Sequence, residues 1–228
     1  MAFLFASCSA PPAREASSFE VVASIPPLAY LVEKIGGTDV PVEVLLQPGQ
    51  EPHTFEAKPQ HVETILRSRL LVAVGLLPFE RQLLDRIGAM ERKPKVLECA
   101  AGLALRPFVE YEFDCAGHDE EEHAHEENGA GELPMDPHVW LGPACLEQMA
   151  KTIAAALTEL VPEKAALFES NLAALLEALR ARDAASMERL KPWRGRSVVV
   201  FHPAFGYFLD QYGLRQRAVE VGGKQPTP

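Results

Sequence analysis

Four of the seven histidines in this 228-residue chain lie in one stretch, GHDEEEHAHEENGAGELPMDPHVWL, which spans residues 117–141. Imidazole is a common metal ligand, so the stretch raises the question of whether these four histidines form one site. Three of them, His118, His123 and His125, are interleaved with glutamates in a segment too polar to bury itself. We therefore expect a separate loop over 117–132. It is either a solvated linker or a weak auxiliary metal site whose acidic field concentrates divalent cations.

The fourth histidine of that stretch shares its local context with two others that are distant in the chain. His53 lies in LLQPGQEPHTFE after an apolar strand, His138 in MDPHVWLGP ahead of a helical pattern, and His202 at the end of the strand SVVVFH. All three lie in loops that lead into a helix, where open α/β sheets bind ligands. One such histidine alone is more often structural, but three in matching contexts favour a metal site. Three imidazoles suit zinc at about 2.0 to 2.1 Å.

The other reactive side chains predict no second site. His61 lies on a helix face in KPQHVETI, and we expect it to be solvated. Cys99, Cys115 and Cys145 have no CxxC spacing, so they are expected to be buried or free thiols. The paired glutamates of the acidic stretch have no apolar surroundings that would raise a carboxyl pKa, so they are not expected to be catalytic.

The elements that would position the histidines begin with alternating strand and helix patterns. This alternation predicts a parallel α/β layer. The expected strands are 19–25, 40–46, 70–75 and 95–99. The expected helices are 26–37, 58–69 and 78–90.

A different pattern begins at Pro143, where apolar residues recur at helical spacing over about 50 residues. This pattern predicts one very long helix over 143–192, kinked or broken at Pro162. The α/β alternation then resumes with a buried strand at 196–202, a helix at 203–213 and a strand at 215–221. Two strands are too few for an α/β domain, so we expect a second lobe that is truncated at the C-terminus.

The two ends of the chain and its charge limit the possible functions. The start, MAFLFASCSAPPAREASSFE, resembles the end of an export signal followed by a tether, and Phe5 to Cys8 resembles a lipobox in which Cys8 would be lipidated. An ordinary cleaved signal and an apolar start without meaning are the alternatives. The formal net charge of -10 disfavours nucleic acid as a partner and favours a cation. No run of eighteen apolar residues is present to span a membrane.

The segments PGQEPHTFEAKPQHV, DPHVWLGP and VVVFHPAFGYFLDQYGL, in this order and with the long helical pattern, resemble one family. It comprises the metal-binding solute-binding proteins of bacterial ABC importers for zinc and manganese. The resemblance runs from about residue 19 to the last residue. It implies an α/β fold of two parallel-sheet lobes joined by a long rigid helix, with the metal between the lobes and the second lobe incomplete here.

The resemblance also implies the ligands. His53, His138 and His202 match the first three ligand positions of the family. Manganese-type members carry a carboxylate where His202 stands, and Mn²⁺ prefers oxygen whereas zinc accepts imidazole, so His202 favours zinc. In the family a fourth, acidic ligand comes from a part of the second lobe that lies beyond this chain. The fourth position is therefore expected to be taken by water or by Glu51.

Together these observations predict four regions: a signal remnant and tether at 1–18, an N-terminal lobe at 19–142, a linking helix at 143–192, and the start of a C-terminal lobe at 193–228. The predicted function is extracytoplasmic binding of Zn²⁺ and its delivery to an ABC permease, without catalysis, by a periplasmic or cell-surface monomer anchored by lipid. A homologue that binds Mn²⁺ or Fe²⁺, a zinc hydrolase and a metal-binding adhesin lipoprotein are the alternatives. HExxH and GxSxG motifs are both absent, which disfavours the hydrolase.

Overall fold

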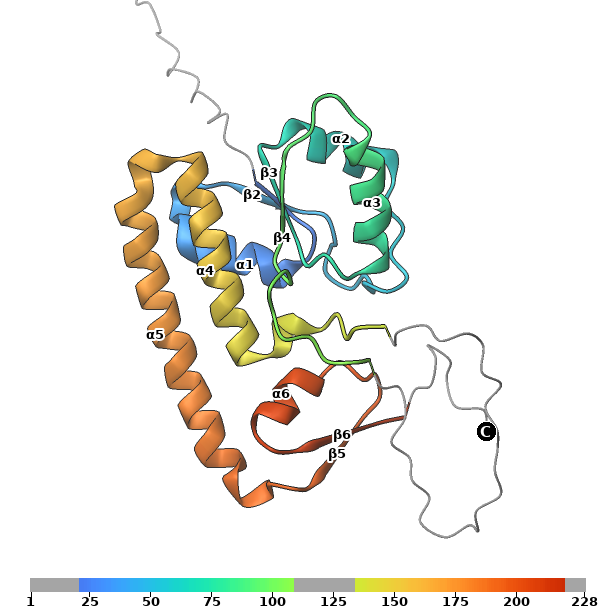
Figure 1. Cartoon of the computed structure of the whole chain (residues 1–228), viewed down its shortest axis with the longest axis vertical. Coiled ribbons are helices and arrows are strands. Elements are labelled where there is room, and N and C mark those ends of the chain that lie inside the picture. The colour runs from blue at the N-terminus through green and yellow to red at the C-terminus, as the bar shows by residue number, and fades with distance from the viewer. Residues whose placement is uncertain (1–20, 109–133, 220–228) are drawn as a thin grey trace, which may run out of the picture.

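The computed structural model describes residues 21–108 and 134–219, and these form two α/β lobes connected by a long helix (Figure 1). The sheet of the N-terminal lobe is entirely parallel and has the strand order β2-β1-β3-β4. The strands are β1 (Val21–Ala23), β2 (Val42–Val44), β3 (Leu70–Ala73) and β4 (Lys95–Glu98). Each expected strand of this lobe is present, with shorter bounds than the apolar patterns suggested.

The helices of the N-terminal lobe each begin at a proline, which has the backbone angle of a first helical turn and no N–H to leave unpaired. The two central strands, β1 and β3, are buried on both faces, as expected for continuous apolar runs in a parallel sheet. Figure 1 shows α2 and α3 on one side of the sheet and α1 on the other. The helices are α1 (Pro26–Gly36), α2 (Pro59–Arg67), α3 (Pro78–Gly88) and α4 (Pro143–Leu160).

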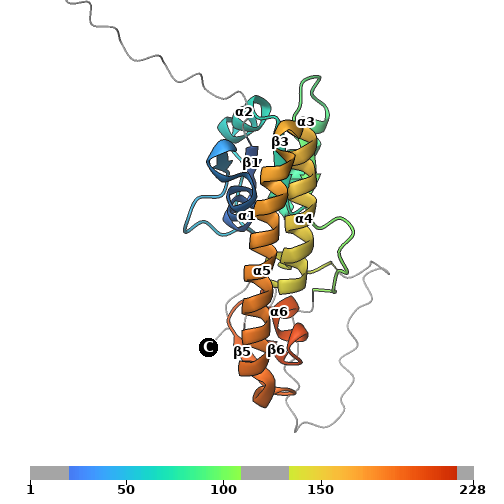
Figure 2. The same cartoon turned by 90° about the vertical axis from the view of Figure 1, so that its left-hand side faces the viewer.

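The helix expected over 143–192, with a kink or break at Pro162, is broken there into two helices, α4 and α5 (Ala165–Leu190), joined by a short 3-10 turn at Pro162–Lys164. Proline has no backbone N–H for a helical hydrogen bond and its ring clashes with the preceding turn, so α4 ends and the chain reverses. The two helices lie side by side and pack on α1 (Figures 1 and 2). Only α5 continues beyond the N-terminal lobe, and at 26 residues it is about 39 Å long.

The second lobe is built on the far end of α5. It contains a parallel pair of strands, β5 (Ser197–Val200) and β6 (Arg215–Ala218), with α6 (Gly206–Gln211) between them in the chain. Its small core consists of Leu209, Tyr212 and Leu214. Asp183 on α5 accepts hydrogen bonds from Tyr212 Oη and Gln211 Nε2, both at 2.7 Å, which hold α6 against the long helix.

The expectation that the strand at 196–202 is buried was wrong. Val199 is 63% exposed and Phe201 is 56% exposed, and α6 is the main described element that packs against this two-stranded sheet. None of the helices described here has both the length and the apolar character needed to cross a membrane. Within the described residues, β5 presents apolar side chains to solvent, an arrangement that promotes pairing with other chains.

We predict that Val199→Lys reduces concentration-dependent self-association, because a lysine on an exposed strand disfavours strand pairing between copies. Sedimentation velocity over a range of protein concentrations measures this. Leu167→Lys, which replaces a 41% exposed residue at the N-lobe end of α5, is the matched control and should leave association unchanged. Equal effects of the two lysines would show that general charge, and not the β5 edge, controls association.

Candidate metal centre

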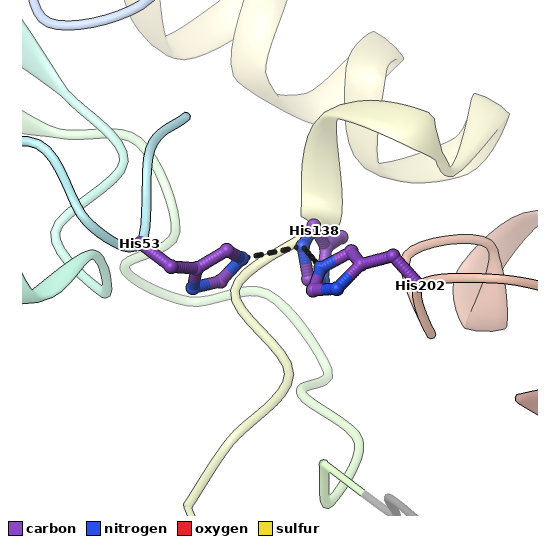
Figure 3. A group of neighbouring side chains, drawn as sticks. All are labelled: His53, His138 and His202. Atoms are coloured by element: carbon purple, nitrogen blue, oxygen red, sulfur yellow. Dashed lines mark hydrogen bonds between the residues drawn. The ribbon is translucent and has the colours of Figure 1, made fainter. Parts of the chain in front are cut away.

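The three histidines with matching sequence contexts meet at one point between the two lobes (Figure 3). His53 comes from the loop between β2 and α2, and His138 immediately precedes the 3-10 turn Val139–Leu141 that leads into α4. His202 comes from the C-terminal lobe, two residues after β5 ends. Two lobes thus supply one cluster of imidazoles.

The geometry of the cluster fits a single small cation. His138 Nε2 lies 2.9 Å from His53 Nε2 and 3.2 Å from His202 Nε2, and the candidate ligand atoms all lie within 4.8 Å of one another. Nitrogens held at about 2.0 to 2.1 Å from a tetrahedral zinc are about 3.3 Å apart. Small rotations of the rings would therefore place all three nitrogens around one ion. Among the described residues this is the only group of three or more potential ligands that converges in this way.

Asp136 fixes the orientation of the central histidine. Asp136 Oδ1 accepts hydrogen bonds from both the backbone N–H of His138, at 3.0 Å, and from its ring Nδ1, at 2.8 Å. Because a carboxylate only accepts, the ring proton resides on Nδ1 and the lone pair of Nε2 faces the other two histidines. Both residues are almost fully buried. This is the carboxylate–histidine arrangement that orients metal ligands in proteins.

Residues from both lobes surround this buried pair. Arg106 Nη1 lies 3.8 Å from Asp136 Oδ2, and Tyr207 of α6 donates its hydroxyl hydrogen to the backbone carbonyl of Asp136 at 2.8 Å. Burial raises the pKa of Tyr207 above its usual value, so the phenol keeps the proton that it donates. The rings of Phe108 and Trp140 lie 5.9 and 5.2 Å from that of His138, which limits how far the imidazole can turn.

The sequence placed Asp136 in the same binding motif as His138 but predicted no separate role for it, and it predicted none for Arg106 or Tyr207. The signal that could have identified Asp136 is its position two residues before His138, because an Asx side chain commonly bonds the backbone two residues later. No comparable local signal marks Arg106 or Tyr207. Their proximity to Asp136 depends on how the lobes pack.

Glu51 and His61 each accept a hydrogen bond from a backbone N–H group nearby in the chain. Glu51 Oε1 accepts a hydrogen bond from the backbone N–H of His53 at 3.2 Å, and its carboxylate is not part of the converging group. His61 is half-buried, against our expectation of a solvated ring, because its Nδ1 accepts the N–H of Lys58 at 2.9 Å and so caps α2. Its ring also packs against Phe55.

The remaining candidates are thiols and residues outside the described parts of the chain. Cys99 is buried and Cys145 is half-buried; both are free thiols, as expected, and burial raises the pKa of each. Cys8, Cys115 and the acidic loop with His118, His123 and His125 lie outside the residues that the structure describes.

Comparisons with known proteins point in one direction. A family model described as the periplasmic component A of a zinc-uptake complex, ZnuA, matches residues 21–228. Zinc-binding lipoprotein AdcA of Streptococcus pneumoniae serotype 4 is 31% identical over 90% of this chain and 39% of its own length. High-affinity zinc uptake system protein ZnuA of Yersinia pestis is 29% identical over 87% of this chain and 64% of its own length. The chain thus spans less than two thirds of each of these relatives.

Solved structures agree with the fold. A crystal structure of ZnuA superposes with a TM-score of 0.76 and 32% sequence identity, covering 92% of this chain and 73% of the other. A structure of Zn(II)-bound AdcA from Streptococcus pneumoniae gives a TM-score of 0.72 at 27% identity, over 89% of this chain and 39% of that one. The arrangement of two lobes joined by a long helix is therefore common to these proteins and to this chain.

Asp136→Asn should weaken divalent-metal binding by about 10 to 100-fold, the usual effect of losing the partner that orients a ligating histidine. Asparagine can donate as well as accept, so it no longer dictates that Nδ1 carries the proton. Titration with Co²⁺, followed by visible absorption, measures both affinity and ligand geometry. Asp39→Asn, which changes a carboxylate that pairs with Lys164 at 2.9 Å in the N-terminal lobe, away from the lobe junction, is the control. If both variants bind like the parent, Asp136 does not set the geometry of the centre.

Proposed function

This chain belongs to the family of periplasmic zinc-uptake components, and on that premise we propose that it binds Zn²⁺ between its two lobes and delivers the ion to an ABC permease. The observation that carries the proposal is the convergence of three histidine Nε2 atoms from two lobes. We further propose that His53, His138 and His202 are the protein ligands of the ion. The location that follows is extracytoplasmic, with Cys8 as the point of lipid attachment.

The set of ligands favours zinc over harder cations. Imidazole is a borderline ligand that suits zinc, whereas Mn²⁺ is better matched by carboxylate and carbonyl oxygen. The charge of the ion also needs compensation, which three neutral imidazoles do not provide. Asp136, hydrogen-bonded behind His138, places one negative charge a single ring away from the ion and increases the basicity of that ligand. We propose that water completes the coordination, since Glu51 bonds within its own loop.

Binding and release follow from where the ligands lie. His53 and His138 belong to the N-terminal lobe and stay together when the lobes move, whereas His202 travels with the C-terminal lobe. Separating the lobes removes one of three protein ligands and leaves a weaker, two-histidine site. Each imidazole must offer its Nε2 without a proton, so uptake is favoured when the rings are neutral. The chain forms and breaks no covalent bond in this cycle, which is a function of capture and delivery.

Replacing His53, His138 or His202 singly by Ala should lower zinc affinity by more than about 100-fold, because even partners of ligands cost 10 to 100-fold. Isothermal calorimetry with a competing chelator gives the affinity and the stoichiometry. His61→Ala is the matched control: it removes a cap of α2 and should cost about 0.5 to 2 kcal/mol of stability without altering zinc affinity. Equal losses for His61→Ala and His138→Ala would contradict the assignment. Glu51→Gln should leave the affinity unchanged if water is the fourth ligand.

Deleting residues 117–131 should leave the tight zinc site intact and remove only weak additional binding. A charged loop that must be ordered around an ion pays a conformational cost that a fixed site does not. The expected calorimetric result is a smaller number of sites with the tight constant retained. Loss of the tight constant would mean that the acidic loop, and not the three converging histidines, holds the ion.

A further inference from the structure

We propose that Arg106 is a positioning residue that holds the two lobes together and thereby sets the distance between His138 and His202. This inference rests on the zinc-binding function proposed above and assigns a role to a residue that does not contact the cluster itself. Arg106 lies in the loop after β4, and its side chain is 25% exposed. It contacts both of the chain segments that carry these two histidines.

The first contact is with the segment that carries His138. Arg106 Nη1 lies 3.8 Å from Oδ2 of Asp136, whose other oxygen holds both N–H groups of His138. The backbone joins the same two residues, since the N–H of Asp136 donates to the carbonyl of Arg106 at 2.9 Å. A buried carboxylate needs a compensating positive charge. The Arg106 guanidinium supplies it, so displacement of Arg106 leaves Asp136, and with it His138, without its electrostatic partner.

The second contact is with α6, which begins four residues after His202. Arg106 Nε lies 3.3 Å from Asp210 Oδ2, and the backbone N–H of Arg106 donates to the hydroxyl of Tyr207 at 3.2 Å. The same hydroxyl donates to the carbonyl of Asp136. Tyr207 of the C-terminal lobe thus lies between the two N-lobe residues and bonds to both. The docking of α6, and hence the place of His202, depends on where Arg106 and Asp136 are held.

Gly206 gives an independent reason to treat this contact as specific. A Cβ atom at Gly206 would overlap the Arg106 guanidinium. Gly206 is the first residue of α6 and has no positive φ, so its backbone conformation does not require glycine. The absence of a side chain is instead what allows the guanidinium to pass beside α6 and approach Asp136.

The two ion pairs of Arg106 differ in how strongly they contribute to holding the lobes together. Asp210 is 58% exposed, and pairs in contact with solvent contribute little. Asp136 is 2% exposed, so its pairing with Arg106 is screened far less by water. Asp210→Asn should therefore change zinc binding only slightly, whereas Arg106→Ala should weaken it by about tenfold or more, the range found for groups that orient metal ligands.

The experiment is a double-mutant cycle between Arg106 and Gly206 in the full chain, with zinc affinity and the visible spectrum of bound Co²⁺ as readouts. Arg106→Ala and Gly206→Ala should each weaken binding and each alter the Co²⁺ spectrum, because the position of His202 changes. The double variant should bind no more weakly than Arg106→Ala. Without the guanidinium, a Cβ at Gly206 meets Asp136 Oδ2 at 3.0 Å, a contact that a small movement relieves.

Arg180→Ala is the matched control. Arg180 of α5 pairs with Glu147 of α4, so this substitution removes the same charge at a place away from the lobe junction. Arg106→Gln replaces the Ala variant if the latter does not fold. The proposed role of Arg106 is contradicted if Arg106→Ala binds zinc as tightly as Arg180→Ala does. It is also contradicted if Gly206→Ala lowers zinc affinity as much in the Arg106→Ala background as in the parent chain. Two further measurements distinguish failure of this proposal from failure of the proposed function. If the parent chain binds no zinc, or if His138→Ala binds zinc as tightly as the parent does, then the proposed function is contradicted.

Discussion

The buried hydrogen bond between Asp136 and His138 is the constraint on which the arrangement of the site depends. A carboxylate removed from water carries a large desolvation cost unless hydrogen bonds and an opposite charge offset it. Here one oxygen takes two N–H groups of His138 and the other faces Arg106. The requirement for these partners determines much of the local structure: the loop geometry at 136–138, the path of the loop after β4, and the glycine that leaves space for the guanidinium.

The same constraint contributes to the defined shape of a site that lies between two lobes. The N-terminal lobe holds its two histidines on elements anchored to one large core. The C-terminal lobe is connected to the N-terminal lobe by α5. The backbone hydrogen bonds of this helix keep its two ends at a nearly fixed separation. The remaining freedom is rotation of the small lobe about the end of the helix. Tyr207, Gln211 and Asp183 limit that rotation through hydrogen bonds on α6.

Local patterns in the sequence were sufficient for the alternating elements of the first lobe and for the prediction that His53, His138 and His202 come together. Those features are encoded within a few residues: apolar runs, prolines at helix starts, and a histidine after a strand. What could not be foreseen depends on distant contacts. The spacing of apolar residues in α4 and α5 is the same for one kinked helix as for two packed helices, so the reversal at Pro162 is not encoded there. Likewise, SVVVF has the composition of a buried strand, and its exposure depends on what covers the sheet.

Buried charged residues were the largest gap, because their burial depends on how the surrounding chain folds. Glu80 illustrates this outside the site: its carboxylate is enclosed near the end of β3 and accepts the backbone N–H groups of Val74, Gly75 and Leu77. Burial raises the pKa of Glu80, and its enclosure is evident only when the turn between β3 and α3 is folded. In a sequence, such a glutamate is indistinguishable from a solvated residue of α3. The Arg106–Asp136 pair has the same property, since the two residues are separated by a segment that says nothing about their contact.

The difference in size between the two cores has a consequence for how binding and structure are linked. The large core extends through the N-terminal lobe and into the helices α4 and α5, whereas the described part of the second lobe has a core of three buried residues with a few partly buried neighbours. Among the described residues, the docking of α6 therefore rests on the smaller core. An ion that joins His202 to His53 and His138 binds the docked state and not the undocked one, so it stabilises that docking by its own binding free energy. By the same linkage, any interaction that favours docking strengthens the site, and any that opposes it promotes release.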